Sequence, residues 1–364
     1  MKNLGRPRHM SNPRLQSTTG LVQPVSRMPA PVGGRVPHSP PPRRGGLALR
    51  ISSCARVPAP DKWLTTAAPT DPVASVAQLA LKTRLSAVAR YLHEATRGDD
   101  PVEGVHQLRI WARRSAAALR LFGAFVPRRG RRWLRRTLRK LRRTAGGVRD
   151  ADVQLAALSA EGRSPPRGLR KRIRRRRRAA RRRLAQLARR LGRRARLERR
   201  IQRLVDRVAL AGDGGRPGPT FGPWARAALR REAAEFFALM ASDAPGDEAL
   251  HALRIAAKRL RYVLELAVAA LPRAAARALY GELTELQDRL GVVCDHRAML
   301  ERLYDWGRPA RGGLGQRKLR RLLEQEIEQL IAARAAFRSW WSPSRRTRFQ
   351  RQWNAALAGR GRRK

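Results

Sequence analysis

One basic, histidine-led segment occurs twice in this chain at a fixed spacing. Residues 106–117 read HQLRIWARRSAA and residues 251–262 read HALRIAAKRLRY, so both contain the pattern His-x-Leu-Arg-Ile-x-Ala-basic-Arg. The two segments start 145 positions apart (251 − 106), and the same shift without gaps places Gly146 on Gly291. Histidine is rare here, with six in 364 residues, so composition alone does not account for the matched histidines. The constant register predicts an internal duplication in which two units of similar order fold alike.

Helical periodicity dominates both units. Ala, Leu and Arg are frequent, apolar residues recur three or four positions apart, and no alternating β pattern is present. We therefore expect an all-α fold. The expected helices cover residues 72–95, about 103–125, 128–145, 150–160, 167–209, 221–241, the second motif, 273–290, 296–306 and 315–341.

Composition divides the chain into five parts. The ends are rich in Pro, Gly or Arg and poor in the apolar residues that would offset ordering entropy. A translation start at an internal methionine such as Met28 is an alternative for the first part. The expected parts are a disordered basic Pro/Arg-rich tail (1–70), a first helical half (72–210), a linker (211–219), a second helical half (220–341) and a basic C-terminal tail (342–364).

Helical geometry places the histidine and three cations of each motif on one face. At 100° per residue, offsets of 0, 3, 7 and 8 fall within an arc of about 140°. The opposite face carries apolar residues, which are Leu108, Leu119 and Phe122 in the first motif helix and Leu253, Leu260 and Leu264 in the second. Each helix thus presents a polar face while its back packs into a bundle. The polar sets are His106, Arg109, Arg113 and Arg114, and His251, Arg254, Lys258 and Arg259.

A second repeated element is a Gly-x-x-x-Asp turn, in LRRTAGGVRDAD and LQDRLGVVCDHR. Gly146 and Gly291 suit helix C-termini, and Asp150 and Asp295 suit the N-caps of the helices that follow. Structural capping is our main interpretation of the two aspartates. The alternative is that each aspartate lies near the cationic face and orients a histidine or an arginine.

The charge of the chain points to a polyanionic partner. Lys and Arg number 81 against 27 Asp and Glu, which gives a formal net charge of +54. Such a fold repels itself unless a polyanion or dense counterions compensate, and guanidinium groups suit bidentate contacts with phosphate oxygens. Nucleic acid, an anionic membrane surface and inorganic polyphosphate are the candidates. The Arg-rich stretch 170–183, with Arg174 and Arg178, either adds cations to such a site or forms a nonspecific outer patch.

Other features bound the function. A basic stripe on an amphipathic helix is often only a solvated face, but duplication in register favours binding. Each motif histidine either contacts the anion or caps a local backbone carbonyl, and the absence of His or Cys at metal-ligand spacing predicts no metal or cofactor. Cys54 and Cys294 lie far apart, so we expect no disulfide and a reducing compartment. No stretch approaches the ~18 apolar residues of a membrane span, and we expect a cytoplasmic protein.

The two motifs and the Gly-x-x-x-Asp turns that follow them resemble the CHAD domain, the conserved histidine α-helical domain. The resemblance covers about 72–341, and both halves match separately and in the expected order. It implies two four-helix-type bundles related by a pseudo-twofold axis, with a basic cleft between them that binds inorganic polyphosphate. Many members of this family carry an N-terminal CYTH triphosphatase domain, whose Glu-x-Glu-x-Lys strand this sequence lacks. We therefore expect a stand-alone binding module.

The resemblance also implies a set of binding residues. Tyr262 and Glu265 match the family pattern of the second half, whereas the first half has Ala117 and Arg120 at the corresponding positions. Arg139 and Arg142, on a neighbouring helix, are weaker candidates. The expected polyphosphate-binding residues are His106, Arg109, Arg113, Arg114, His251, Arg254, Lys258, Arg259 and Arg261.

Our leading expectation is a non-enzymatic polyphosphate-binding protein. A nucleic-acid or nucleoid-associated protein is the first alternative, which the charge supports but the low aromatic content (5%) disfavours. A phosphohydrolase or phosphotransferase that uses the paired histidines with Asp150 and Asp295 is the second, although no carboxylate cluster for Mg²⁺ is evident. The sequence leaves open the oligomeric state, any partner enzyme and a location on polyphosphate granules.

Overall fold

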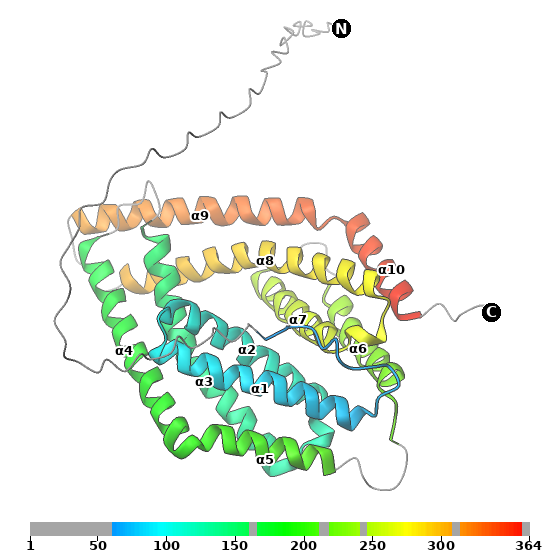
Figure 1. Cartoon of the computed structure of the whole chain (residues 1–364). Helices are drawn as coiled ribbons and strands as arrows, with labels where there is room; N and C mark the ends of the chain where they lie inside the picture. The colour runs from blue at the N-terminus through cyan, green and yellow to red at the C-terminus, as the bar shows by residue number, and fades with distance from the viewer. Residues whose placement is uncertain (1–59, 160–165, 211–217, 241–245, 308–313, 359–364) are drawn as a thin grey trace, which may run out of the picture. The chain divides into compact units, whose positions relative to one another are not determined.

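The computed structural model describes residues 60–159, 166–210, 218–240, 246–307 and 314–358. These residues form ten α-helices and three short 3-10 segments, with no strand among them, so the predicted all-α class is confirmed (Figure 1). The expected tail over 1–59, the linker over 211–217 and the last residues 359–364 lie outside this part. The helices are α1 (Val73–Arg97), α2 (Pro101–Leu121), α3 (Arg128–Ala157), α4 (Arg167–Gly192), α5 (Arg196–Leu210), α6 (Phe221–Ala238), α7 (Asp247–Leu266), α8 (Arg273–Gly307), α9 (Leu314–Trp340) and α10 (Pro343–Ala358), and the 3-10 segments are η1 (Gly123–Phe125), η2 (Arg193–Ala195) and η3 (Val268–Ala270).

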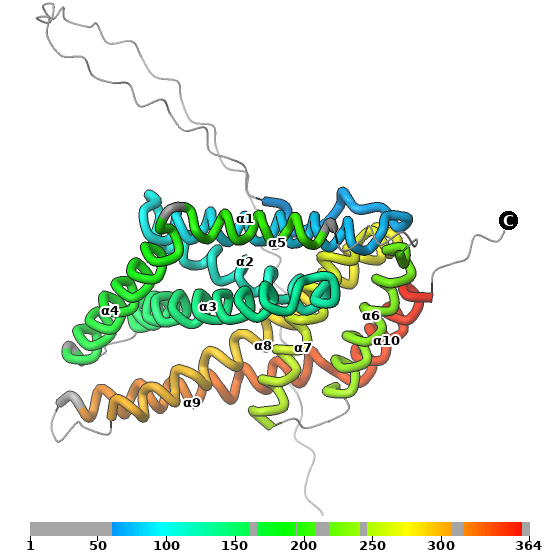
Figure 2. The backbone as a smooth tube through the Cα atoms, turned by 90° about the horizontal axis from the view of Figure 1, so that it is seen from below, coloured from blue at the N-terminus to red at the C-terminus, as the bar shows by residue number. Residues whose placement is uncertain are grey.

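The helices form two sets of five that pack in the same order. In the first set α1 packs on α2, α2 on α3 and α3 on α4, and α5 returns to α1. In the second set α6 packs on α7, α7 on α8 and α8 on α9, and α10 returns to α6. Figure 2 shows α1 beside α5 on one edge and α8 beside α9 on another. The motif helices α2 and α7 contact each other where the sets meet. This order is what a duplication would produce, and the duplication itself stays a prediction.

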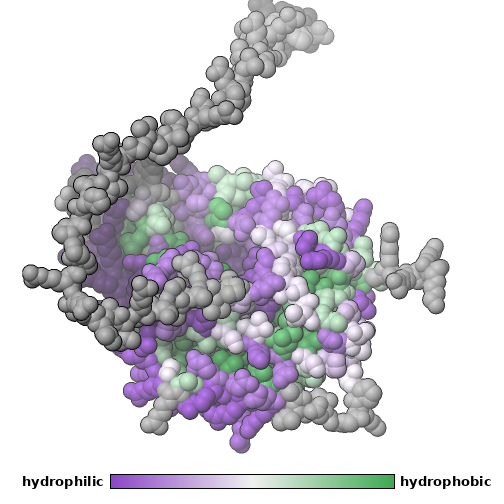
Figure 3. All heavy atoms as spheres, viewed as in Figure 1, coloured by the Kyte–Doolittle hydropathy of each residue, from purple (hydrophilic) through white to green (hydrophobic). Residues whose placement is uncertain are grey.

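The backs of the two motif helices form part of one continuous core. All six apolar residues that the helical wheel placed there are buried: Leu108, Leu119, Phe122, Leu253, Leu260 and Leu264. A second, smaller apolar cluster, which includes Leu158, Ile173 and Leu303, joins the far ends of α3, α4, α8 and α9. Hydrophilic side chains predominate along the lower margin of the face in Figure 3, where α5 lies. No helix in the described part is long and apolar enough to cross a membrane.

The predicted helix breaks at the repeated glycines are wrong. α3 runs unbroken through Gly146 and α8 through Gly291. An interior glycine costs a helix about 1 kcal/mol relative to alanine, which packing of the flanking turns on α2 and α7 outweighs. Asp150 and Asp295 therefore lie inside helices, and the capping interpretation of both is also wrong.

The single helix expected over 167–209 is two helices. α4 ends at Gly192, and Ala195 in η2 adopts a left-handed φ of 49° before α5 begins. The turn lets α5 fold back on α1, where Leu197, Ile201 and Leu204 are buried. Burial of this apolar face, rather than local helix propensity, sets the break.

Both expected tails contain ordered, packed segments. In the N-terminal one, Leu64 is buried and its amide donates to the Glu265 carbonyl over 3.0 Å. In the C-terminal one, α10 buries Phe349 and Trp353, and Arg230 of α6 donates to the Leu357 carbonyl over 2.8 Å. These parts of the tail predictions are wrong because a few large apolar anchors secure segments of tails whose average composition is basic and polar.

Candidate anion-binding cleft

A cleft of about 1120 Å³ opens between α2, α3 and α7. Its apolar lining includes Ala116, Leu119 and Leu138, and eleven arginines and lysines surround this lining. No aspartate or glutamate of the described residues lines it. The cationic residues are Arg109, Arg113, Arg120, Arg131, Arg135, Arg139, Arg142, Arg143, Arg254, Lys258 and Arg259, and His251 is with them.

Two cleft arginines at matching motif positions lie near the two repeated aspartates. Arg109 Nη1 on α2 donates to the Gly146 carbonyl over 3.1 Å and to Asp150 Oδ1 over 3.0 Å. Arg254 Nη2 on α7 lies 3.9 Å from Asp295 Oδ1 of α8. The hydrogen bond from Arg109 supports the alternative interpretation for Asp150, in which the aspartate holds an arginine in place, whereas Asp295 is only near Arg254.

The innermost cations of the cleft are crowded and poorly solvated. Burial, with the positive charges of Arg254 and Arg113 next, lowers the pKa of Lys258 to about 7. Burial likewise lowers the pKa of the Arg113 guanidinium, with Arg109, Arg142 and Arg254 adding to the effect. Uncompensated positive charge of this kind is relieved when an anion enters.

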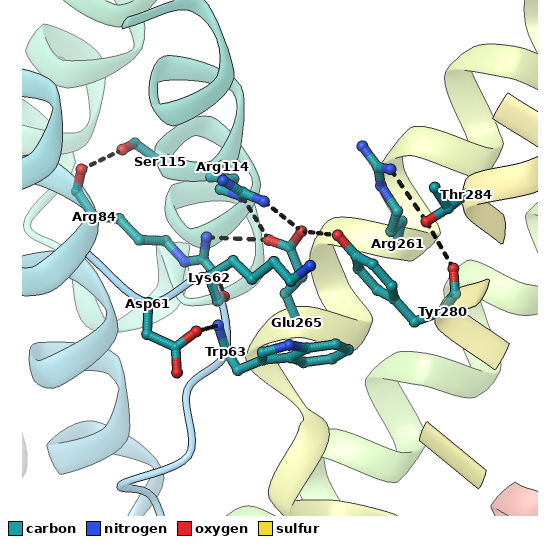
Figure 4. Close-up of polar contacts among 10 residues, drawn as sticks. All are labelled: Asp61, Lys62, Trp63, Arg84, Arg114, Ser115, Arg261, Glu265, Tyr280 and Thr284. Carbon is teal, nitrogen blue, oxygen red and sulfur yellow. Dashed lines mark hydrogen bonds and ion pairs between the residues drawn. The ribbon is translucent and has the colours of Figure 1, made fainter. Parts of the chain in front are cut away.

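Arg114, a predicted cleft residue, lies elsewhere. Its Nε and Nη2 atoms donate to the Glu265 carboxylate over 2.8 and 3.0 Å, and both side chains are buried (Figure 4). Arg84 Nη1 also reaches this carboxylate over 3.4 Å, and the Tyr280 hydroxyl donates to it over 3.3 Å. Successive residues of a helix point in directions that differ by 100°. Arg113 therefore points into the cleft, whereas Arg114 points to the side of α2 that faces α1 and α7.

Two other predicted residues also lie off the cleft lining. Arg261 Nη1 donates to Thr284 Oγ1 over 3.4 Å, and its guanidinium lies over the Tyr280 ring at 5.5 Å (Figure 4). His106 is half-buried, and burial, followed by the charge of Arg149, lowers its pKa. His251, at the matching position, is exposed and lines the cleft, so the two motif histidines have different surroundings.

The remaining predicted cations divide between cleft and surface. Arg259 lines the cleft and lies 3.6 Å from Glu235, with both side chains exposed. Arg139 and Arg142, the weaker candidates, line it as well. Arg174 and Arg178 are exposed on α4 and belong to the outer surface.

Four cleft arginines were missing from the predicted set. Three of them lie on α3 at helical spacing from Arg139, and the fourth lies in the last turn of α2. Motif matching favoured the helices that carry the histidines, whereas a helical wheel of α3 would have found most of this set. The missed residues are Arg120, Arg131, Arg135 and Arg143. In the described part of the chain, no group of three or more His, Cys, Asp or Glu side chains is arranged to hold a metal ion.

A solved CHAD domain structure shares this all-α fold. The crystal structure of the CHAD domain from the plant Ricinus communis is similar to this chain with a TM-score of 0.57 and 22% identity, over 79% of this chain and 93% of that one. PptA from Streptomyces chartreusis matches with a TM-score of 0.47 and 19% identity, over 74% of this chain and 99% of that one. No curated protein matches significantly. The sequence model of the CHAD domain matches residues 79–304, more than half of the chain, and the chain therefore belongs to the CHAD domain family.

Proposed function

We propose that this protein binds inorganic polyphosphate, without catalysis, in the cleft between α2, α3 and α7. One observation carries the proposal: eleven cations line a single cleft in which the described residues place no carboxylate. A linear polyanion satisfies many such cations at once, and each contact to a phosphate oxygen is charge-assisted. Family membership agrees with a polyphosphate-related role.

The cleft suits a phosphate chain better than a nucleic acid. Proteins that bind single-stranded nucleic acid usually stack bases on aromatic side chains. Among the described residues, Tyr262 is the one aromatic side chain of the cleft lining, and it is only 6% exposed. Bases would therefore add bulk without gaining a stacking surface.

Competition between the two polyanions tests the proposal. At about 200 mM salt, we expect labelled polyphosphate to stay bound when duplex DNA is added at equal phosphate concentration. Salt should weaken binding steeply in both cases, since counterion release drives association with any polyanion. Displacement of polyphosphate by the DNA would refute the assignment.

A catalytic role has less support from the geometry. Phosphoryl transfer generally needs Mg²⁺ held by carboxylates, whereas Asp150 and Asp295 each lie beside an arginine. We expect no phosphate release from polyphosphate above the protein-free rate when Mg²⁺ or Mn²⁺ is supplied. Release that disappears on Asp150→Asn substitution would instead establish an enzyme.

Binding should weaken as the pH rises above 7. The pKa of Lys258 is about 7 in the free cleft, and a bound polyanion would raise it toward the ordinary lysine value. Below pH 7 the lysine is charged before and after binding. Above pH 7 binding must take up a proton, so affinity should fall by up to about tenfold for each pH unit.

The conservative variant Lys258→Arg isolates this effect. Arginine stays protonated throughout the range, so the variant should lose most of the dependence on pH between 7 and 9. Titration calorimetry with tripolyphosphate in this window is the measurement. An equal pH dependence in both proteins would assign the effect to the ligand or to other groups of the protein.

A further inference from the structure

A second cationic groove of about 490 Å³ lies on the opposite flank of α3, against α4. It contains neither motif histidine, and it lies outside the helices that carry the motif. Five cations and no carboxylate of the described residues line it. The lining residues are Arg136, Arg139, Lys140, Arg143, Thr144, Gly147, Ala180 and Arg183.

Small residues form the base of this α3–α4 groove. A Cβ atom built on Gly147 would lie 3.6 Å from Ala180 Cβ, so the two helices approach closely there. Thr144 Oγ1 donates to the Lys140 carbonyl of its own helix over 2.8 Å, which keeps this hydroxyl close to the backbone. The cations thus stand above a shallow base of small side chains.

Two other cations of α4 already have protein partners. Arg177 pairs with Asp152, and Arg170 Nη2 donates to the Leu158 carbonyl over 3.2 Å and to Ser159 over 3.0 Å. In contrast, no carboxylate within the described ranges forms an ion pair with any of the five groove cations. The α3–α4 groove therefore combines unneutralised charge with open space.

Two residues connect this groove to the central cleft. Arg139 and Arg143 line both cavities, and they are four residues apart, which makes them neighbours on one helical ridge. Arg135 and Arg142 extend the row on the cleft side. α3 is thus a ridge with cations on both flanks and a shared pair at its crest.

We propose that one long polyphosphate chain occupies both cavities and crosses α3 between Arg139 and Arg143. This inference rests on the proposed function and assigns the α3–α4 groove as a second subsite for the same polyanion. No aromatic residue of the described segments lines the groove, which favours a phosphate chain over stacked bases. A short chain fills the central cleft alone, whereas a long chain gains a tethered second set of contacts.

The test compares two chain lengths in two variants. R136A/K140A/R183A removes the three groove cations that are absent from the cleft lining. We expect it to weaken binding of polyphosphate of several tens of units by about tenfold or more, as loss of a tethered contact set would. Binding of tripolyphosphate should change by less than about twofold, because the short chain makes no contact in the groove and the loss of even one contact would change the affinity by more than that.

A second variant, Thr144→Trp, fills the groove without changing charge and should cause the same loss for the long chain alone.

A matched control separates local contact from net charge. R199A/R203A/R207A removes three exposed arginines of α5, which packs on α1, and these arginines line neither cavity. We expect long-chain binding by this control to stay within about threefold of the unaltered protein.

Equal losses of affinity in the groove variant and the control would overturn the second subsite. Equal losses of affinity for the two chain lengths would do so as well. Failure of the unaltered protein to bind either chain would overturn the proposed function itself. Duplex DNA is also added as a competitor to the unaltered protein and to the groove variant. If the DNA displaces the long chain from the unaltered protein but not from the groove variant, the groove binds nucleic acid and the inference is overturned.

Discussion

Loss of the four central cations of the cleft is expected to weaken polyphosphate binding by at least about 100-fold while the helices stay folded. A hydrogen bond to a charged group contributes about 1.5–3 kcal/mol, so two lost contacts already exceed this loss. The partners left behind, Asp150 and Asp295, are substantially exposed and can be hydrated. Titration with labelled polyphosphate and far-UV circular dichroism are the measurements. The variant changes Arg109, Arg113, Arg254 and Lys258 to alanine.

The control for this variant is a four-alanine change on the outer face of α4. It removes the same formal charge from exposed positions that line neither cavity. Binding should fall by less than about tenfold, since exposed charges act mainly through a screened field. An equal loss in both variants would mean that net charge, and not the cleft, holds the ligand. The control changes Arg174, Arg175, Arg176 and Arg178.

The second large effect concerns stability. Glu265→Ala should lower the free energy of unfolding by about 3–5 kcal/mol, because it leaves two buried guanidinium groups without their carboxylate. Glu265 is fully buried, and Arg84 and Arg114 are 3% and 9% exposed. They join α7 to α1 and α2, so the carboxylate holds the two helix sets together. Chemical denaturation followed by circular dichroism measures the change.

Two further variants show whether buried charge is the cause. Glu232→Ala breaks the more exposed pair with Arg120 and should cost only about 1 kcal/mol or less. The triple change R84M/R114M/E265L replaces the buried charges with apolar groups and should recover most of the lost stability. A loss in Glu265→Ala no larger than that in Glu232→Ala would show that this contact does not secure the interface.

Local properties of the chain were predictable from the sequence. The all-α class and the buried backs of the motif helices follow from periodicity, which each helix carries in its own residues. The cleft positions of Arg109, Arg113, Arg254 and Lys258 follow from the same angular argument, because the third and seventh positions after each histidine lie only about 40° apart on a helix.

Properties set by distant residues were not predictable. The partner of Arg114 is Glu265, 151 positions away, and nothing near Arg114 in the sequence marks it as structural. The unbroken passage of α3 through Gly146 depends on neighbouring helices rather than on glycine's own preference. α10 was not predicted as a helix because Phe349 and Trp353 anchor a segment that is otherwise basic and polar.

The carboxylate at Glu265 makes the two helix sets non-interchangeable. In the 145-residue register, the first set carries Arg120 at the position of Glu265 (265 − 145 = 120). A symmetric dimer of two first sets, joined as α2 and α7 are joined here, would place arginine against Arg114 and Arg84 with no acid between them. Such a dimer would repel itself at its own interface. The two helix sets must therefore differ at this position to pack together. A single covalent chain ensures that each first set meets a second set.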